Sequence, residues 1–280
     1  MNKKTCAITG ATGGIGAALA QYALSEGYDL ILHSRSKLKL RKLIETLKRE
    51  TQEARIEPVV GDLESAEATK KVSAEIATLA PTLNLLFNNA GVLLDGIQIS
   101  PDNLELHTQV NLIAPYILME TLKINLARAN GTIINVSSGT VLRAKSLSIE
   151  TLQRPAQSKK LFGAYAMSKL ALSVVTNALG NEYAAEGVTL ASVDPGPNKT
   201  NMTAGAGMPF FLLILRPFFY SAPEKGAKSL FEAYQLSRNY PPGTFFSKGK
   251  ARSFPAFTQD PSTIENLLEF CRVSADFSTA

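Results

Sequence analysis

The feature that most constrains the fold of this chain is a regular alternation of short apolar runs with longer amphipathic segments. Short apolar runs bounded by turn residues are typical of strands, and the longer segments have the spacing of helices. A helix between two strands lets those strands lie parallel in one sheet that is covered on both faces. The alternation therefore predicts an α/β fold with a doubly wound, seven-stranded parallel sheet and helices on both faces.

The pattern assigns most of the chain to one of the two element types. The expected strands are Thr5–Thr9, Asp29–His33, Ile56–Val60, Leu83–Asn88, Thr132–Ser137, Val188–Val193 and Gly243–Phe246. The expected helices are Ile15–Glu26, Lys37–Glu50, Ala66–Leu79, Pro101–Ala129, Ala164–Ala185 and, in the tail, Pro261–Arg272. Three regions break the alternation: an insertion at about 139–163, an irregular, then very apolar, segment at about 200–222, and the tail from about Ala251 onward.

Length and charge limit what kind of protein this is. No Gly-, Ser- or Pro-rich linker divides the 280 residues, so we expect a single domain over 1–280. Much of the +5 net charge lies in the expected helix from Lys37 onward, which we interpret as a solvated face and not as a nucleic-acid site. Cys6 and Cys271 do not suggest a disulfide framework, and neither a signal peptide nor a membrane-spanning run is evident, so we expect a cytoplasmic setting.

A glycine-rich turn follows the first expected strand and opens the first expected helix. Glycine tolerates positive φ and lets a backbone approach a phosphate, while a helix start offers free N–H groups and a positive dipole end. This context predicts a dinucleotide site and a Rossmann-type fold, although a tight turn that binds nothing is the alternative. The residues expected to hold the cofactor here are Gly10, Thr12, Gly13, Gly14, Ile15 and Gly16.

The end of the second expected strand lacks the acidic residue that usually meets a ribose 2′-hydroxyl. Arg35 can instead hold a 2′-phosphate by charge-assisted hydrogen bonds, helped by Ser34 and Ser36. The sequence therefore favours NADP(H) over NAD(H), with an exposed arginine at a helix start as the alternative.

Tyr165 and Lys169 lie four residues apart and hence on one face of an expected helix. Free tyrosine has a pKa near ~10, which is high for proton exchange at neutral pH. An ammonium group and the positive charge of an oxidised nicotinamide both favour the phenolate, so we expect the pKa of Tyr165 to fall. Tyr165 would then protonate a carbonyl oxygen or deprotonate an alcohol.

Taken in order along the chain, these motifs resemble the short-chain dehydrogenase/reductase family. The resemblance rests on the glycine turn, Asp62-Leu63, Asn88-Asn89-Ala90-Gly91, Asn111, Val136-Ser137-Ser138, Tyr165-x-x-x-Lys169 and Pro195-Gly196 with Thr200. The moderate length favours the compact single-domain branch over the larger epimerases. The 27-residue step from position 138 to position 165, and the ending from Tyr240 to Phe246, resemble retinol-dehydrogenase-like members.

The resemblance implies a role for each matched residue. Ser138, rather than Ser137, would hold the substrate oxygen, and Asn111 would support a water chain toward Lys169, which would also bind the nicotinamide ribose. The other matched residues are implied to line the cofactor: Asp62 and Leu63 beside the adenine, Asn89, Ala90 and Gly91 beyond the fourth strand, and Pro195, Gly196, Asn198 and Thr200 beside the nicotinamide. Pro197 is a departure that removes one backbone donor and leaves the carboxamide contacts open.

The most apolar stretch, Met208–Tyr220, follows the nicotinamide loop, where the family has its substrate lid. We expect a lid over an apolar pocket and hence an apolar carbonyl or alcohol substrate; contact with a membrane surface or a partner, or ordinary core packing, are the alternatives. A homo-oligomer is left open. His33 and His107 lack companions at ligand spacing, so we interpret them as a strand-end residue and a packing residue, and we expect no metal.

The sequence as a whole predicts an NADP(H)-dependent oxidoreductase that interconverts an apolar carbonyl compound and its alcohol. A non-catalytic NADP(H)-binding sensor or interaction protein on the same fold is the second hypothesis, and an epimerase or dehydratase is the third.

Overall fold

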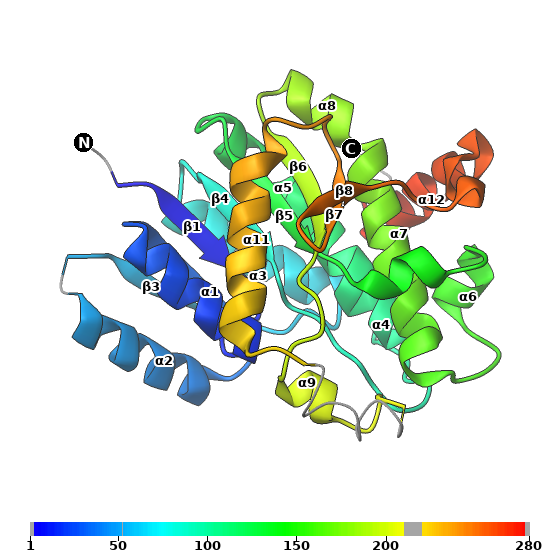
Figure 1. Ribbon diagram of the computed structural model, residues 1–280, viewed down its shortest axis with the longest axis horizontal. Helices are drawn as coiled ribbons and strands as arrows, with labels where there is room; N and C mark the ends of the chain where they lie inside the picture. The colour runs from blue at the N-terminus through cyan, green and yellow to red at the C-terminus, as the bar shows by residue number, and fades with distance from the viewer. Residues whose placement is uncertain (1–2, 52, 210–219, 278–280) are drawn as a thin grey trace.

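The computed structural model describes residues 3–51, 53–209 and 220–277. Its central sheet has the strand order β3-β2-β1-β4-β5-β6-β7-β8 (Figure 1). The strands are β1 (Thr5–Ile8), β2 (Asp29–Ser34), β3 (Ile56–Val60), β4 (Leu85–Asn88), β5 (Thr132–Val136), β6 (Thr189–Asp194), β7 (Phe245–Ser247) and β8 (Lys250–Arg252). Strands β1 to β7 are all parallel, which confirms the predicted seven-stranded parallel arrangement and the Rossmann-type fold.

The sequence pattern does not predict the eighth strand, β8. It pairs antiparallel with β7 across a tight turn in which Lys248 and Gly249 have φ values of 53° and 70°. Positive φ at both central positions is what a two-residue hairpin turn of the favoured twist needs. All three β8 residues are exposed, so the strand carries none of the apolar pattern by which the others are found.

Helices cover both faces of the sheet. They are α1 (Gly14–Ser25), α2 (Lys37–Glu50), α3 (Ala66–Leu79), α4 (Leu106–Thr108), α5 (Ala114–Ala127), α6 (Ile149–Gln153), α7 (Ala164–Ala178), α8 (Gly180–Ala185), α9 (Asn201–Ala204), α11 (Pro223–Ser237) and α12 (Pro261–Ser274). Short 3₁₀ turns occupy Gly139–Arg143, Lys160–Phe162 and Ala256–Gln259. The bounds of α2 and α3 match the prediction because each begins at a serine, Ser36 or Ser65, whose side chain accepts a hydrogen bond from the first helical turn.

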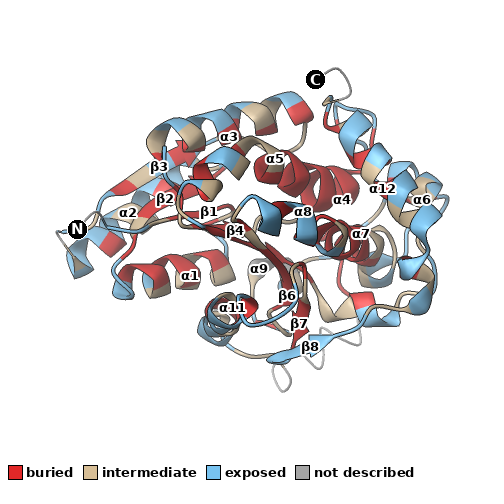
Figure 2. Cartoon of the chain, turned by 90° about the horizontal axis from the view of Figure 1, so that it is seen from above, coloured by how far each residue is buried: buried red, intermediate tan, exposed pale blue. Residues whose placement is uncertain are grey.

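Successive residues of each strand enter opposite halves of the core. Leu30 and Leu32 of β2 belong to the buried cluster formed with α1, α2 and α11, whereas Ile31 belongs to the cluster formed with α3, α5 and α7. Seen from above, the strands and the inner faces of these helices are buried, and β8 and α6 lie at the exposed margin (Figure 2). This burial on both faces explains why the strands read as continuous apolar runs.

Two expected helices differ from the structure. Within 101–129, a turn at Asn103, whose φ is 67°, delays the helix start to Leu106, and a π-helix at Gln109–Ile113 then separates α4 from α5. Within 164–185, the helix breaks at Leu179, beside Gly180. A Cβ on Gly180 would lie 2.6 Å from the carbonyl carbon of Pro242, so glycine at this position lets the helix pack closely against the loop that precedes β7.

The pattern also leaves out α11, although its sequence carries a helix signal. Pro223 occupies the first turn, and Ala227, Leu230 and Phe231 follow at the spacing of one buried face. The helix packs against α1, on the face of the sheet opposite to α3, α5 and α7, and connects β6 to β7. The tail helix α12 is confirmed and packs against α7 with Leu267, Phe270 and Cys271 buried.

Candidate active site

A cavity of about 750 Å³ opens beyond the carboxyl ends of the parallel strands. It lies where the strand order reverses, since β1 leads to β2 and β3 on one side and neighbours β4 on the other. Such a switch point is where doubly wound sheets bind ligands. All of the predicted site residues line this cavity except Ser36 and Asn111.

The glycine turn is built for a close backbone approach. Gly10 has a φ of 64°, and a Cβ placed on it would lie 2.8 Å from the Cα of Ala90. A Cβ on Gly16 would lie 2.3 Å from the carbonyl oxygen of Gly10, so no larger residue fits there. Gly13 caps α1 without a side-chain hydrogen bond, which leaves the N–H groups of the first helical turn available to an anion. The residues present therefore fit a dinucleotide pyrophosphate.

His33 lies beneath this turn, a role that the sequence alone does not suggest. Its Nδ1 accepts from the N–H of Gly10 at 3.5 Å, and its Nε2 lies 3.1 Å from the carbonyl oxygen of Gly61. Burial lowers the pKa of His33, so the ring is neutral at physiological pH and can accept at one nitrogen and donate at the other. The ring thus links the glycine turn after β1 to the end of β3.

The expected 2′-phosphate site combines an arginine, an acidic residue and two serines. Arg35 is 68% exposed at its side chain, and its Nη1 lies 3.4 Å from Oε1 of Glu64. Ser34 is buried and shares a hydrogen bond of 2.8 Å with Thr12, while its Oγ also accepts from the N–H of Ser36. Ser36 is turned toward α2 as its N-cap. An exposed arginine with an acidic neighbour can exchange that neighbour for a phosphate, because an exposed ion pair contributes little.

Ser138, Tyr165 and Lys169 line the same cavity. Ser138 follows β5, and its Oγ accepts from the hydroxyl of Thr140 at 3.0 Å. Tyr165 and Lys169 lie one turn apart on α7, and both are buried. The Nζ of Lys169 donates to the carbonyl oxygen of Val136 at 2.7 Å. The structure therefore brings together three of the four residues that the sequence predicts to be catalytic.

The pKa values of the two titratable members differ from the expected pattern. Burial raises the pKa of Tyr165 to about 12, partly opposed by a hydrogen bond with Ser138, and the nearby Asp194 adds to the rise. Burial lowers the pKa of Lys169 to about 8. The predicted fall in the pKa of Tyr165 also depends on the positive charge of a bound oxidised nicotinamide, so it stays a prediction; in the protein chain alone, desolvation is the largest influence and raises the pKa.

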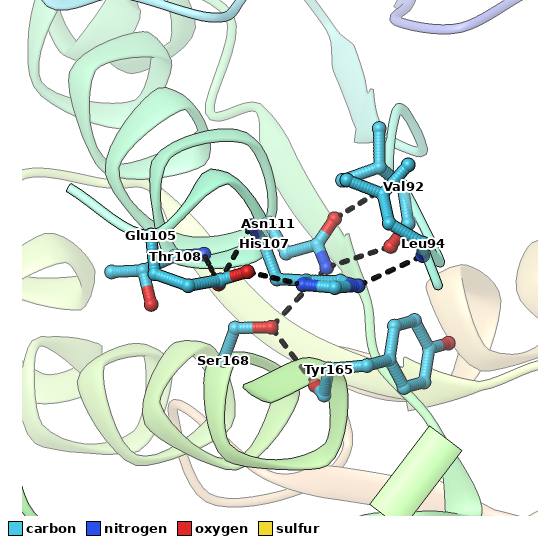
Figure 3. A network of polar contacts seen from close by, with 8 residues as sticks. All are labelled: Val92, Leu94, Glu105, His107, Thr108, Asn111, Tyr165 and Ser168. Carbon is cyan, nitrogen blue, oxygen red and sulfur yellow. Dashed lines mark hydrogen bonds and ion pairs between the residues drawn. The ribbon is translucent and has the colours of Figure 1, made fainter. Parts of the chain in front are cut away.

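Asn111, the fourth predicted residue, lies just behind the cavity wall in the π-helix (Figure 3). Its Oδ1 accepts from the N–H of Val92 at 2.9 Å, and its Nδ2 donates to the carbonyl oxygen of Val92 and to Oγ of Ser168. The wide π turn is common at functional sites. The side chain of Asn111 therefore joins α7 to the loop that follows β4.

The loop after β6 is held by its own side chains. Asp194 accepts from the N–H of Gly196 at 2.9 Å and from the hydroxyl of Ser247 at 2.8 Å. The side chain of Asn198 is buried and donates back to the carbonyl oxygens of Pro195 and Gly196. Asn198 thus shapes this loop from within. Asp194 is a cavity residue that the sequence reasoning omits; its place directly before Pro195-Gly196 was the available signal.

Fold and cavity together define a class of protein, an oxidoreductase whose hydride carrier is a nicotinamide dinucleotide. The family model described as short chain dehydrogenase matches residues 4–208, and the chain belongs to that family. Its members act on CH–OH and C=O groups, so the protein is an enzyme of this kind.

Similar proteins support the family and the branch. The chain is 28% identical over 279 residues to short-chain dehydrogenase TIC 32 A, chloroplastic, from Brassica napus, covering 95% of this chain and 87% of the relative. It is 28% identical over 232 residues to human retinol dehydrogenase 13, covering 80% of this chain and 70% of the relative. A short-chain dehydrogenase from Sphingobium yanoikuyae, solved in complex with NADPH, has the same fold, with a TM-score of 0.67, 22% identity and coverage of 84% and 85%. The resemblance to retinol-dehydrogenase-like members is thereby confirmed.

Two further findings concern the described residues. No helix within them is both long and apolar enough to cross a membrane. No group of three or more His, Cys, Asp or Glu side chains within 3–51, 53–209 and 220–277 is arranged to hold a metal ion.

Proposed function

We propose that the protein is an NADP(H)-dependent reductase and dehydrogenase that interconverts an apolar carbonyl compound and its alcohol. The observation that carries this proposal is the convergence of Ser138, Tyr165 and Lys169 on one cavity with the glycine turn. The bound nicotinamide supplies or takes the hydride. The residues of the chain move the proton and hold the substrate oxygen.

Tyr165 is the proposed proton donor and acceptor. Its pKa of about 12 in the chain alone keeps the hydroxyl protonated, which suits the donor role in carbonyl reduction. A positive charge brought next to the ring favours the phenolate and lowers the barrier to proton release. Ser138 holds the substrate oxygen: its Oγ accepts from Thr140, so its own hydroxyl proton, which also bonds Tyr165, is the one it can donate to that oxygen.

Lys169 and Asn111 support the proton transfer. Lys169 has a pKa of about 8 and is therefore mostly charged at pH 7, which places a cation in the same buried wall as Tyr165. We propose that Lys169 also binds the nicotinamide ribose, and that Asn111 supports a water chain to it. A Cβ on Gly91 would lie 3.0 Å from Oδ1 of Asn111 and 3.5 Å from Nζ of Lys169, so the two polar groups approach each other at this glycine.

The cofactor preference rests on Arg35. We propose that Arg35, with Ser34 and the backbone at Ser36, binds a 2′-phosphate and that NADP(H) is preferred to NAD(H). Asp62 and Leu63 flank the adenine in this proposal, and Glu64 is the acid that the phosphate displaces from Arg35.

The substrate end of the cavity supports an apolar carbonyl compound. Its wall includes the apolar side chains of Leu93, Leu142, Leu161, Phe162 and Met208. Residues 210–219 of the proposed lid at about 200–222 lie outside the described residues, and Met208 and Tyr220, on either side of that stretch, line the cavity. Contact of this apolar segment with a membrane surface, and assembly into a homo-oligomer, stay as hypotheses beside the lid.

A cytoplasmic setting also stays a proposal. Cys6 and Cys271 are both buried and unpaired, and they belong to clusters on opposite faces of the sheet. This placement suits a reducing compartment, while one similar protein is named as chloroplastic.

The test is consumption of NADPH, followed by absorbance, with a panel of carbonyl compounds of graded polarity. Aliphatic and aromatic aldehydes or ketones should be reduced with higher kcat/KM than small polar ones. Tyr165→Phe should lose turnover and still bind NADPH. Binding without turnover in the unmodified protein would favour the sensor hypothesis, and conversion without net NADPH consumption would favour an epimerase or dehydratase.

A further inference from the structure

A buried acid, Glu105, and a buried histidine, His107, lie beside Leu94 and Tyr165 (Figure 3). Tyr165 and Leu93, the neighbour of Leu94, line the cavity. Glu105 is 0% exposed and His107 is 3% exposed, and the Nδ1 of His107 lies 2.7 Å from Oε1 of Glu105. His107 is therefore more than the packing residue that the sequence suggests. Neither residue belongs to the groups proposed above to touch the cofactor or the substrate.

The hydrogen bonds fix where the protons are. The backbone N–H of Leu94 donates to Nε2 of His107 at 2.9 Å, so Nε2 carries no proton. Nδ1 must then carry the proton and donate it to Glu105. The other oxygen of Glu105, Oε2, accepts from the N–H groups of His107 and Thr108 at the start of α4, a position that favours a carboxylate. The pair is thus a neutral imidazole held by an ionised acid.

His107 and Asn111 lie one helical turn apart and hold the same loop at alternate residues. Asn111 binds both backbone groups of Val92, and His107 binds the N–H of Leu94. The residue between them, Leu93, is buried, lines the cavity and packs with Tyr165 and Met208. Clamping the backbone at positions 92 and 94 fixes the orientation of the side chain between them, at position 93.

Two further contacts show that this clamp has little room to relax. A Cβ on Gly207 would lie 2.7 Å from the carbonyl oxygen of Leu94 and 2.9 Å from that of Leu93, so the loop is pressed between His107 and the segment after β6. The imidazole of His107 also meets the ring of Tyr165 edge to face, with centroids 6.2 Å apart. One side chain therefore contacts both the loop and the proposed proton donor.

We infer that Glu105 and His107 are a positioning pair for the substrate site. The acceptor at Nε2 of His107 fixes the loop Val92–Leu94, and the edge-to-face contact of the imidazole fixes the ring of Tyr165. Glu105 selects the tautomer of His107 that exposes this acceptor. The inference rests on the proposed function for its catalytic consequence, but the clamp itself is a property of the fold. Small displacements of a positioned group can cost up to about 100-fold in rate.

The test compares two amides at position 107. In His107→Gln, the amide oxygen can replace Nε2 and accept from Leu94; in His107→Asn, the shorter amide can replace only Nδ1 and leaves the Leu94 N–H without its acceptor. Thr108→Val is the control, since Thr108 is equally buried on the same turn and its hydroxyl has no partner among the described residues. Each variant is assayed for kcat and KM with the best carbonyl substrate, for the Kd of NADPH, for Tm, and for hydrogen exchange at the Leu94 amide.

We expect His107→Asn to lower kcat/KM for the carbonyl at least about 10-fold, with the Kd of NADPH changed less than about twofold. Exchange at the Leu94 amide should accelerate at least about 10-fold. His107→Gln should recover most of both losses, and Thr108→Val should behave as the unmodified protein. Equal losses in the two amide variants, or unchanged Leu94 exchange in His107→Asn, would overturn the inference. If the unmodified protein reduces no carbonyl compound, the proposed function fails, and the exchange measurement still decides whether the clamp exists.

Discussion

The ammonium group of Lys169 lies 2.7 Å from the carbonyl oxygen of Val136, so a charged side chain of α7 ends against the last residue of β5 inside the protein. Lys169 is 4% exposed, and its burial lowers its pKa to about 8 from an ordinary 10.5. The fold therefore holds a cation at a cost in stability, which is typical of functional sites.

The cost at Lys169 can be measured from the pH dependence of unfolding. Because the folded pKa is depressed, the unfolded chain binds more protons between pH 8 and 10.5, and the free energy of unfolding should rise with pH across that window. A shift of this size corresponds to roughly 3 kcal/mol at pH 7, less about 1 kcal/mol for the lost hydrogen bond. Lys169→Met should therefore be inactive yet more stable than the unmodified protein at pH 7, with the difference shrinking toward pH 10.

Urea unfolding at pH 7, 8.5 and 9.5 would check this prediction. Lys71→Met is a suitable control, because Lys71 is exposed and its ion pair among the residues that the structure describes is with Glu67 on the same helix. A stability difference at Lys169 that stays constant with pH, or that grows, would show that the buried amine does not change its protonation there.

Cofactor choice should depend on charge at position 35. Arg35→Asp replaces a phosphate-binding cation with an anion, and the loss of charge-assisted hydrogen bonds should raise the KM for NADPH about 10- to 100-fold. The KM for NADH should change less than about threefold. Glu64→Gln removes the acid that competes for Arg35 and should lower the KM for NADPH modestly, since the exposed pair itself is weak. Steady-state kinetics with NADPH and with NADH test this prediction. If Arg35→Asp raised the KM for both cofactors equally, the 2′-phosphate assignment would be contradicted.

The glycine turn should tolerate a methyl group at one position and not at another. A Cβ at Gly16 would lie 2.3 Å from the carbonyl oxygen of Gly10, whereas one at Gly13 would lie 3.3 Å from the same atom. Gly16→Ala must move backbone, so it should weaken NADPH binding at least about 10-fold and lower Tm. Gly13→Ala should have a much smaller effect on Tm. Fluorescence titration with NADPH and thermal unfolding of both variants would reveal whether the turn is as tight as its geometry implies.

The tail helix should contribute to the stability of the domain. Phe270 is 7% exposed and packs in the main cluster through the contact of α12 with α7, while Val273 on the same helix is 55% exposed. Truncation of a buried phenylalanine costs about 3–5 kcal/mol, so Phe270→Ala should lower the midpoint of denaturant unfolding substantially. Val273→Ala should change stability by less than about 0.5 kcal/mol. Similar small losses in both variants would mean that α12 is only loosely attached.

The sequence by itself determined the frame of the protein. Apolar periodicity identified seven parallel strands and located α2 and α3, because such a signal is local and depends on a few neighbouring residues. Pro223 and the apolar spacing of α11 are local signals of the same kind. Likewise, the glycine turn predicted a dinucleotide site, and the pair Tyr165 and Lys169 predicted proton transfer, because both motifs depend on short spacings along the chain.

Only the tertiary structure decided how that site is tuned. The rise in the pKa of Tyr165 comes from burial and from Asp194, which is 29 positions later in the sequence (194 − 165), so no local pattern could supply it. Glu105 and His107 matter because the loop at Leu94 returns to them, and Arg35 meets Glu64 only because β2 and β3 are neighbours. Desolvation and contacts between distant segments exist only once the chain is folded, which is why these features could not be derived from the order of residues alone.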